Sequence, residues 1–305
     1  MRRAMEFVVD CREADPLGEY PHMGDLQWWC RDGSLDDQTN WRFWPGTEGH
    51  DLALGLTQGD AVVYLVHPAQ RGRGLEEEVR RWTADRLEQR ARAEGSGTPY
   101  TIADEVADDD PARIVLLERE GYARRSYYYM SYRRDLAAPL PSPVLPAGFS
   151  VRHVAGEEEA SARGAVQRDA FSGTYADEEA TARWLGAMRM PVYDRELDLV
   201  IVAPDGTLAA GCLCWLDARN RIGLFEPVGT RPAYRRHGLA SALMAEGLRR
   251  LAARGATAAL VTAAHPDESG NSGLPPECAG RFVYVKAGFR PLQRVYPYVR
   301  ECRVP

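Results

Sequence analysis

The second half of the chain shows two hydrophobic periodicities, and each predicts one kind of element. Residues 149–154 alternate apolar and polar side chains, as a half-buried strand does. Two segments with apolar residues at helical spacing follow, at residues 157–171 and 177–190. Three strand-like runs come next, joined by short turns, at residues 197–203, 208–215 and 222–230. Strands joined by short turns pair antiparallel, so we expect a meander preceded by two helices.

A long helix and a further strand are predicted after this meander. Four leucines mark the buried stripe of the helix: Leu239, Leu243, Leu248 and Leu251. The helix ends near Gly255, and residues 258–262 form a short strand-like run. This crossover is parallel, and it brings the start of the helix to one end of the sheet. The pattern predicts an α+β (α/β) fold with a mixed, mostly antiparallel sheet flanked by helices.

A proline-rich stretch divides the chain. Residues 135–146 contain four prolines in twelve positions, which disfavours helix and sheet and predicts an extended linker. We therefore expect an N-terminal domain at 1–135, a linker at 136–146 and a C-terminal domain at 147–305. The first domain is harder to assign, because residues 18–40 are rich in tryptophan and polar residues where two helices are expected. Four tryptophans are predicted to be core or domain-interface anchors: Trp28, Trp29, Trp41 and Trp44.

Composition indicates a soluble globular protein. Of the 305 residues, 45% are hydrophobic and 27% are charged, and the formal net charge of -6 gives no bias towards nucleic acid or membranes. The chain has no 18-residue apolar run and no signal-peptide pattern at its start, so we expect a cytoplasmic monomer or homodimer. The six cysteines contain no CxxC pair and no histidine pair has ligand spacing, so we expect no metal site.

The segment between the meander and the long helix carries the strongest chemical signal. A turn that leads from a strand onto a helix start gathers unpaired backbone N–H groups and the positive end of the helix dipole around one point. Here Gly238 and Ala240 leave room for a ligand, and Arg235 and Arg236 add positive charge. These features predict a diphosphate-binding turn, made by Thr230, Arg235, Arg236, His237, Gly238, Leu239, Ala240 and Ser241.

Two motifs resemble those of a known superfamily. The spacing Arg235-x-x-Gly238-x-Ala240 matches the (Q/R)xxGx(G/A) acyl-CoA motif of GNAT-type N-acetyltransferases. Residues 284–289, YVKAGF, resemble the Y-x-x-x-G-F segment that closes a GNAT fold. An ordinary basic turn is the alternative for the first motif alone, whereas the missing GK(S/T) and GxGxxG exclude a Walker loop and a dinucleotide fingerprint. Together the motifs imply acetyl-CoA or another short acyl-CoA as co-substrate.

The resemblance and the chemistry suggest roles for individual residues. By resemblance, the strand backbone binds the pantetheine arm and polarises the thioester carbonyl at Val228, Gly229 and Thr230. Tyr284 is the candidate general acid, because a phenol can return a proton to the CoA thiolate; a core tyrosine is the alternative. Glu226 is the candidate base for the attacking ammonium, and a buried structural Glu or one bonded to Arg221 is the alternative.

One departure from the family pattern affects the cofactor site. Many GNAT members carry Asn seven residues before the acid tyrosine, and here Glu277 stands at that position, in an unusual insertion that begins at His265. The CoA contacts expected from that side are therefore missing from the motif. Asn271, in the same Gly/Ser/Pro-rich insertion, is a weak candidate to replace the amide.

The first half repeats both motifs in damaged form. Residues 66–75 align with 230–239 at an offset of 164, and residues 117–122 parallel 284–289, so the chain is an internal duplication. Glu76 stands where the motif needs Gly or Ala, and a charge about 4 Å from a phosphate repels it by roughly 4 kcal/mol at an effective dielectric of about 20. Leu117 occupies the place of Tyr284. We expect two tandem GNAT domains, the first a structural relic without CoA.

These inferences predict an acyl-CoA-dependent N-acyltransferase. The C-terminal half would transfer an acetyl or short acyl group from CoA to an amine of a small molecule or peptide, by direct attack in a ternary complex. A catalytically inactive acyl-CoA sensor or an interaction module is the alternative. Retention of both motifs in one half, against their loss in the other, favours the enzyme.

Overall fold

The computed structural model describes residues 1–18, 20–31, 38–95, 99–267 and 280–303. The first half contains α1 (Arg2–Ala14), α2 (Met23–Cys30), β1 (Trp41–Pro45), β2 (Asp51–Gln58), β3 (Ala61–Val66), α3 (Leu75–Glu94), β4 (Pro99–Ala107), α4 (Pro111–Arg119), β5 (Ala123–Arg124) and β6 (Tyr127–Asp135). Strands β1, β2 and β3 form an antiparallel meander. Two helices were expected around residues 18–40; among the described residues of that stretch the α-helix is α2, and α1 lies earlier, with its buried side chains beginning at Ala4.

The second half follows the predicted order of elements. It contains β7 (Ser150–His153), α5 (Ala160–Ala170), α6 (Asp177–Met188), β8 (Asp198–Val202), β9 (Leu208–Asp217), β10 (Ile222–Thr230), α7 (Leu239–Ala253), β11 (Ala258–Pro266), α8 (Gly280–Lys286) and β12 (Arg290–Arg303). Strands β8, β9 and β10 form the antiparallel meander, and β10 pairs in parallel with β11. The predicted meander, long helix and crossover are confirmed.

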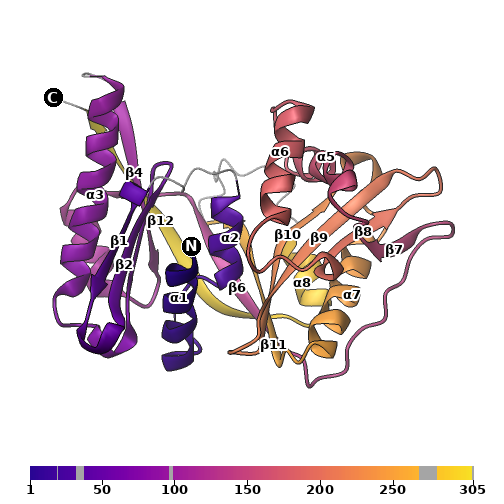
Figure 1. The fold of residues 1–305 in the computed structure, drawn as a ribbon, viewed down its shortest axis with the longest axis horizontal. Helices are drawn as coiled ribbons and strands as arrows, with labels where there is room; N and C mark the ends of the chain where they lie inside the picture. Colours follow the sequence, from indigo (N-terminus) through magenta and orange to yellow (C-terminus); the bar gives the residue numbers. More distant parts are fainter. Residues whose placement is uncertain (19, 32–37, 96–98, 268–279, 304–305) are drawn as a thin grey trace.

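Within the described ranges, twelve strands form one mixed sheet that runs through both halves (Figure 1). The order along it is β1-β2-β3-β4-β12-β6-β11-β10-β9-β8-β7, with β5 paired to β12. Side chains alternate between its faces, as in β9, where Cys212 and Cys214 join the core under α7 while Leu213 and Trp215 join the core under α5 and α6. The predicted fold class is confirmed.

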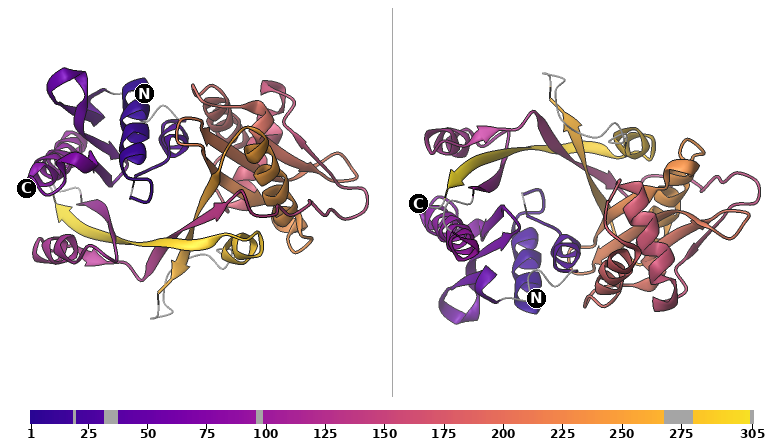
Figure 2. Two further views of the ribbon diagram at one scale, coloured as in Figure 1. Left: turned by 90° about the horizontal axis from the view of Figure 1, so that it is seen from below. Right: turned by 90° about the horizontal axis from the view of Figure 1, so that it is seen from above.

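The two halves exchange their final strands. β6 lies between β11 and β12, and β12 continues into the first half and pairs with β4, all in antiparallel ladders. Figure 2 shows the yellow β12 running from the second half into the purple first half. Asp135 at the end of β6 pairs with Ala258 at the start of β11, and the proline-rich segment leaves the sheet from there. The domain division at 136–146 stays a prediction, because strands from both sides of this segment alternate within one sheet.

The tryptophans of the first half lie in cores and at the junction of the halves, as predicted. Trp28 of α2 packs edge-on against Trp184 of α6, with ring centroids 5.7 Å apart. Trp44 packs against Trp82 of α3 at 5.9 Å, and Trp29 and Trp41 border the core beneath α1. Helix α2 is therefore seated on the second half of the chain. Within the described residues, no helix combines the length and apolar character needed to cross a membrane.

Candidate active site

The predicted diphosphate-binding turn connects β10 to α7. The chain leaves Thr230, passes through the 3-10 turn η6 (Pro232–Tyr234) and enters α7 at Leu239. Arg236 and Gly238 both adopt the left-handed backbone conformation, with φ of 66° and 77°. A Cβ added at Gly238 would meet no atom within 4 Å. This open helix entry leaves the first N–H groups of α7 accessible to an anion.

Arg235 braces the turn. Its Nη2 donates to the carbonyl oxygen of Ala170 at 3.0 Å, and its Nε donates to that of Thr230 at 3.4 Å. The charge of Arg235 was predicted to serve the ligand, and its guanidinium also connects the turn to the end of α5. Arg236 and His237 are exposed, so they are the basic side chains on the surface of the turn.

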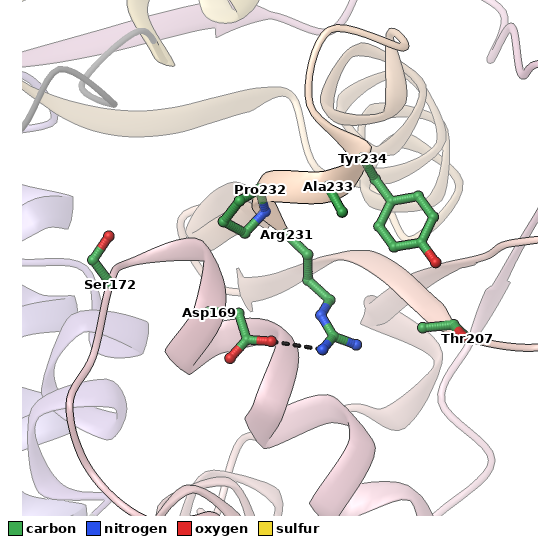
Figure 3. A pocket seen from close by; sticks show the side chains of 7 residues that line it. All are labelled: Asp169, Ser172, Thr207, Arg231, Pro232, Ala233 and Tyr234. Carbon is green, nitrogen blue, oxygen red and sulfur yellow. Dashed lines mark ion pairs between the residues drawn. The ribbon is translucent and has the colours of Figure 1, made fainter.

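A cavity of about 570 Å³ borders the same turn (Figure 3). It lies between η6, the end of α5 and the β8–β9 connection, and its lining residues are Asp169, Ser172, Thr207, Arg231, Pro232, Ala233 and Tyr234. Arg231 points towards Asp169 and forms an ion pair with it at 2.7 Å. Neither Tyr284 nor Glu226 lines this cavity, so it is separate from the residues predicted for the chemistry.

Strands β10 and β11 separate next to the turn. They pair only over residues 222–224 of β10, although β10 continues to Thr230. The register of β10 against β9 shifts between residues 225 and 228, and the Glu226–Pro227 peptide bond there is cis. Beyond this shift, the described ladders pair residues 228–230 with β9 alone. The hydroxyl of Thr230 is buried without a hydrogen-bond partner among the described residues. A ligand with amide groups can pair with such a backbone edge.

Tyr284 lies in α8, in the core shared with α7. Its side chain is 8% exposed, and its ring packs against those of Tyr132 and Phe289 at centroid distances of 6.1 and 6.3 Å. Tyr132 belongs to β6, so the strand contributed by the first half packs directly against the candidate acid. In α4, the corresponding residue of the first half is Leu117, which is fully buried. This buried position therefore holds a side chain with a hydroxyl group in the second half and a side chain without one in the first half.

Glu226 faces the first half of the chain. Burial, the charge of Asp25 in α2 and a hydrogen bond to that residue raise the pKa of Glu226 well above its usual range. Arg31, just after α2, acts in the opposite direction. Arg221, the alternative partner considered from the sequence, donates its Nε to the carbonyl oxygen of Gly255 at 2.9 Å. Asp25 and Arg31 were not predicted as partners of Glu226, because no local sequence pattern connects them with β10.

The first half contains the same turn, filled by its own side chain. Gly72 and Gly74, 164 positions before Arg236 and Gly238, have φ of 72° and 87°. Glu76, in the first turn of α3, accepts a hydrogen bond from the backbone N–H of Gly72 at 2.7 Å. A carboxylate of the chain itself therefore lies where an anion would bind.

The strand opening of the first half is also bridged by side chains. β3 and β4 pair only at Ala61 and Ala103. Beyond that pair, the hydroxyl of Tyr64 donates to Asp104 Oδ2 at 3.3 Å, and Arg113 Nη2 binds Asp104 Oδ1 at 2.7 Å. Asp104 is fully buried, and the Arg113 guanidinium lies 4.3 Å from the centre of the Tyr64 ring. These three side chains join the two strands where the second half leaves its strands apart.

Two positions considered for cofactor contacts, Asn271 and Glu277, lie outside the described residues. Among the residues that are described, no group of three or more His, Cys, Asp or Glu side chains is placed to hold a metal ion. The candidate chemistry in the described part of the second half thus consists of the turn, the edge of β10, Tyr284 and Glu226.

A protein-family model matches a segment of the second half. Residues 165–271 match the model of the Acetyltransferase (GNAT) family. The matched segment includes the meander, the diphosphate-binding turn, α7 and β11, and it ends before α8.

Curated relatives extend the similarity. The mycothiol acetyltransferase of Salinispora tropica is 32% identical over 196 residues, which cover 63% of this chain and 60% of that protein. The mycothiol acetyltransferase of Kineococcus radiotolerans is 30% identical over 152 residues, or 48% of each chain. The chain thus spans less than two thirds of the length of these relatives.

Solved structures share the fold over nearly the whole chain. A GCN5-related N-acetyltransferase from Sphaerobacter thermophilus is 22% identical, with a TM-score of 0.71 over 99% of this chain and 92% of that chain. A tandem GNAT protein from the clavulanic acid biosynthesis pathway is 19% identical, with a TM-score of 0.61 over 98% and 94%. The chain therefore has the tandem GNAT architecture, contains a GNAT acetyltransferase domain and is homologous to the mycothiol acetyltransferases.

Proposed function

We propose that the second half is an acyl-CoA-dependent N-acyltransferase that transfers acetyl from acetyl-CoA to an amine by direct attack in a ternary complex. The observation that carries this proposal is the contrast between two copies of one turn. The copy before α7 is an open left-handed helix entry next to separated strands, whereas the copy before α3 is filled by Glu76 and its strands are bridged through Asp104. Acyl-CoA carries a diphosphate at some distance from its thioester, so it needs both the open helix start and the gap between the strands.

The donor is proposed to lie along β10 and the start of α7. Its diphosphate would bind the N–H groups that follow Gly238, at Leu239, Ala240 and Ser241, with Arg235, Arg236 and His237 nearby. Its pantetheine arm would pair with the backbone edge of residues 228–230. The buried Thr230 hydroxyl, which has no partner in the described part of the chain, supports a ligand contact at this edge.

Glu226 is proposed as the base and Tyr284 as the acid. The amine nitrogen attacks the thioester carbonyl carbon, the C–S bond breaks, and the CoA thiolate takes the phenolic proton of Tyr284. An acceptor that arrives as an ammonium loses two protons in all. One returns to Tyr284, and the other passes through Glu226 to solvent. The raised pKa of Glu226 suits this role, because a base works best when its pKa lies near the working pH.

The first half is proposed to bind no CoA, and the chain is proposed to divide into residues 1–135, a linker at 136–146 and residues 147–305. We place the protein in the cytoplasm as a monomer or homodimer, with acyl-CoA and an amine as partners and neither nucleic acid nor a membrane. The net charge of -6 supports the absence of nucleic acid as a partner.

A thiol-release screen tests the proposal. The protein is incubated with acetyl-CoA and with longer acyl-CoA thioesters, against a library of amines of small molecules and peptides. Because the curated relatives are named mycothiol acetyltransferases, the library includes amines related to mycothiol. We expect thiol release that requires both the thioester and one class of amine, and that is lost in Tyr284→Phe and Glu226→Gln. CoA binding without turnover on any amine would instead favour the alternative, an inactive acyl-CoA sensor.

A further inference from the structure

Helix α2 of the first half is seated on the strand that carries Glu226. The buried His22 caps α2, and its Nε2 lies 3.1 Å from the carbonyl oxygen of Ile222 in β10. Gly24 lies so close to Trp215 that an added Cβ would stand 2.4 Å from the indole. The Nε1 of Trp215 donates to the backbone oxygen of Glu226 at 2.7 Å. One tryptophan therefore contacts both α2 and the backbone of Glu226.

Asp25 is fixed by the start of this helix. Its Oδ2 accepts the backbone N–H of His22 at 2.6 Å, as part of a capping box. Its carboxyl group also hydrogen-bonds the carboxyl group of Glu226. Ionised carboxylates only accept hydrogen bonds, so two carboxyl groups can bond to each other only when a proton lies between them. The raised pKa of Glu226 favours Glu226 as the donor of such a proton and Asp25 as its acceptor.

We propose that Asp25 is a positioning residue for Glu226, which it holds through the shared proton, so that a helix of the first half forms part of the acyltransferase site. This inference rests on the proposed function, in which Glu226 is the base for the acceptor amine. It also gives the half without CoA a part in the chemistry: its α2 places a carboxyl group beside the base of the other half.

The charges around the pair determine the direction of the effect. Among the described residues, Asp25 and Arg31 are the charged groups that act on Glu226: Asp25 raises its pKa and Arg31 lowers it. Burial lowers the pKa of His22 and that of Arg12 in α1, because it disfavours their charged forms. The charge of Asp25 raises both pKa values. Asp217, the last residue of β9, also raises the pKa of His22 and of Arg12, but it is not among the groups that change the pKa of Glu226. Loss of the Asp25 charge therefore lowers the pKa of Glu226.

A titration tests the pairing without any turnover. Glutamate carboxyl carbons are labelled with carbon-13 in the full chain and followed by NMR against pH, and the signal of Glu226 is assigned from the Glu226→Gln variant. We expect Glu226 to titrate well above ordinary glutamates, and its midpoint to fall by about one pH unit or more in Asp25→Asn. Asn keeps an oxygen that can cap α2, so the fold is retained. Circular dichroism melting checks that retention.

A pH profile then tests the consequence for catalysis. A base must be unprotonated to act, so a raised pKa places the acid limb of kcat/KM at higher pH, and Asp25→Asn moves this limb down. At pH values well below the pKa, a pKa lower by one unit gives about a tenfold higher kcat/KM, when each protein is compared with its own plateau value. The matched control is Asp10→Asn, which removes a carboxylate that pairs with Arg219 across the same two halves without contacting Glu226. We expect the control to leave the limb in place.

The outcomes separate this inference from the proposed function. If Glu226 titrates as an ordinary glutamate, or if Asp25→Asn leaves its midpoint unchanged, the pairing is refuted whether or not an acceptor is found. If the protein turns over an amine but the acid limb is the same in wild type and Asp25→Asn, the proposed function stands and Asp25 has no part in it. A protein without any turnover, but with the expected shift of the midpoint, overturns the proposed function and leaves the pairing intact.

Discussion

The backbone N–H of Gly72 donates a hydrogen bond to the carboxylate of Glu76 at 2.7 Å. The contact lies in the turn of the first half that corresponds to the diphosphate-binding turn of the second. Gly72 and Gly74 keep the left-handed conformation of their counterparts, so the backbone of the turn survives. A carboxylate of the chain itself therefore binds the backbone of this turn, next to the start of α3.

This contact predicts one CoA site per chain. We expect isothermal titration calorimetry with CoA to give a stoichiometry of one. Replacing Glu76 by Ala removes the internal carboxylate but leaves the bridge of Tyr64, Asp104 and Arg113 across the strands, so no second site is expected in that variant. Two equivalent sites in the wild type would contradict the CoA-free assignment of the first half.

A matched pair of glycine substitutions tests the anion site. Gly238 and Gly74 have φ of 77° and 87°, and a Cβ at either position meets nothing within 4 Å. We expect Gly238→Ala and Gly74→Ala each to cost about 1 kcal/mol of unfolding free energy, because an L-residue is strained in this conformation. Only Gly238→Ala should also weaken CoA binding, by about tenfold or more, since its Cβ crowds the backbone that approaches the diphosphate. Equal CoA affinities in the two variants would place the diphosphate elsewhere.

The phenol of Tyr284 is expected to matter for rate and little for stability. Tyr284→Phe keeps the buried ring and its contacts with Tyr132 and Phe289, but it removes the proton for the thiolate. Turnover should fall by about 10²- to 10⁴-fold with CoA affinity almost unchanged. Leu117→Tyr in the first half should give no new activity. Wild-type turnover in Tyr284→Phe, under conditions where the chemical step limits the rate, would leave Tyr284 as a core residue only.

Acid should destabilise the protein through His265. Its Nε2 lies 2.8 Å from the hydroxyl of Tyr132, and burial, with the charges of Arg281 and Arg294, lowers its pKa below the ordinary value of 6.5. The folded state thus binds fewer protons than the unfolded state, and stability falls as the pH drops below about 6.5. Urea unfolding at pH 7.5 and 5.5 should show this loss, and His265→Gln should reduce it. An unchanged pH dependence in the variant would assign the loss to other groups, such as the buried His22.

The exchange of final strands predicts that the second half does not fold by itself. A fragment of residues 147–305 lacks β6, which pairs with β11 along its whole length from Ala258 to Pro266. Unpaired backbone groups in a buried strand are costly, so we expect this fragment to show no cooperative thermal transition. The full chain serves as the control. A monomeric fragment that unfolds cooperatively would mean that β12 can take the place of β6 beside β11.

The sequence by itself determined the features that depend on neighbouring residues. The meander of β8, β9 and β10, the long helix α7 and the turn before it follow from hydrophobic period, turn residues and glycine placement, which act over a few residues. The duplication was visible for the same reason, since residues 66–75 and 230–239 repeat one local pattern. Pro227 lies at the register shift of β10, so the regular alternation of side chains along this predicted strand is interrupted beside Glu226.

Only the tertiary structure decided which strands pair across the halves and what faces Glu226. Backbone hydrogen bonds are available to any strand, so the apolar pattern of β6 and β12 does not tell which of them lies next to β11. Asp25 accepts the backbone N–H of His22 at the start of α2, and its second partner, Glu226, is set by how α2 packs on Trp215. Contacts between residues so far apart in the chain come from the packing of whole elements, which no local period records.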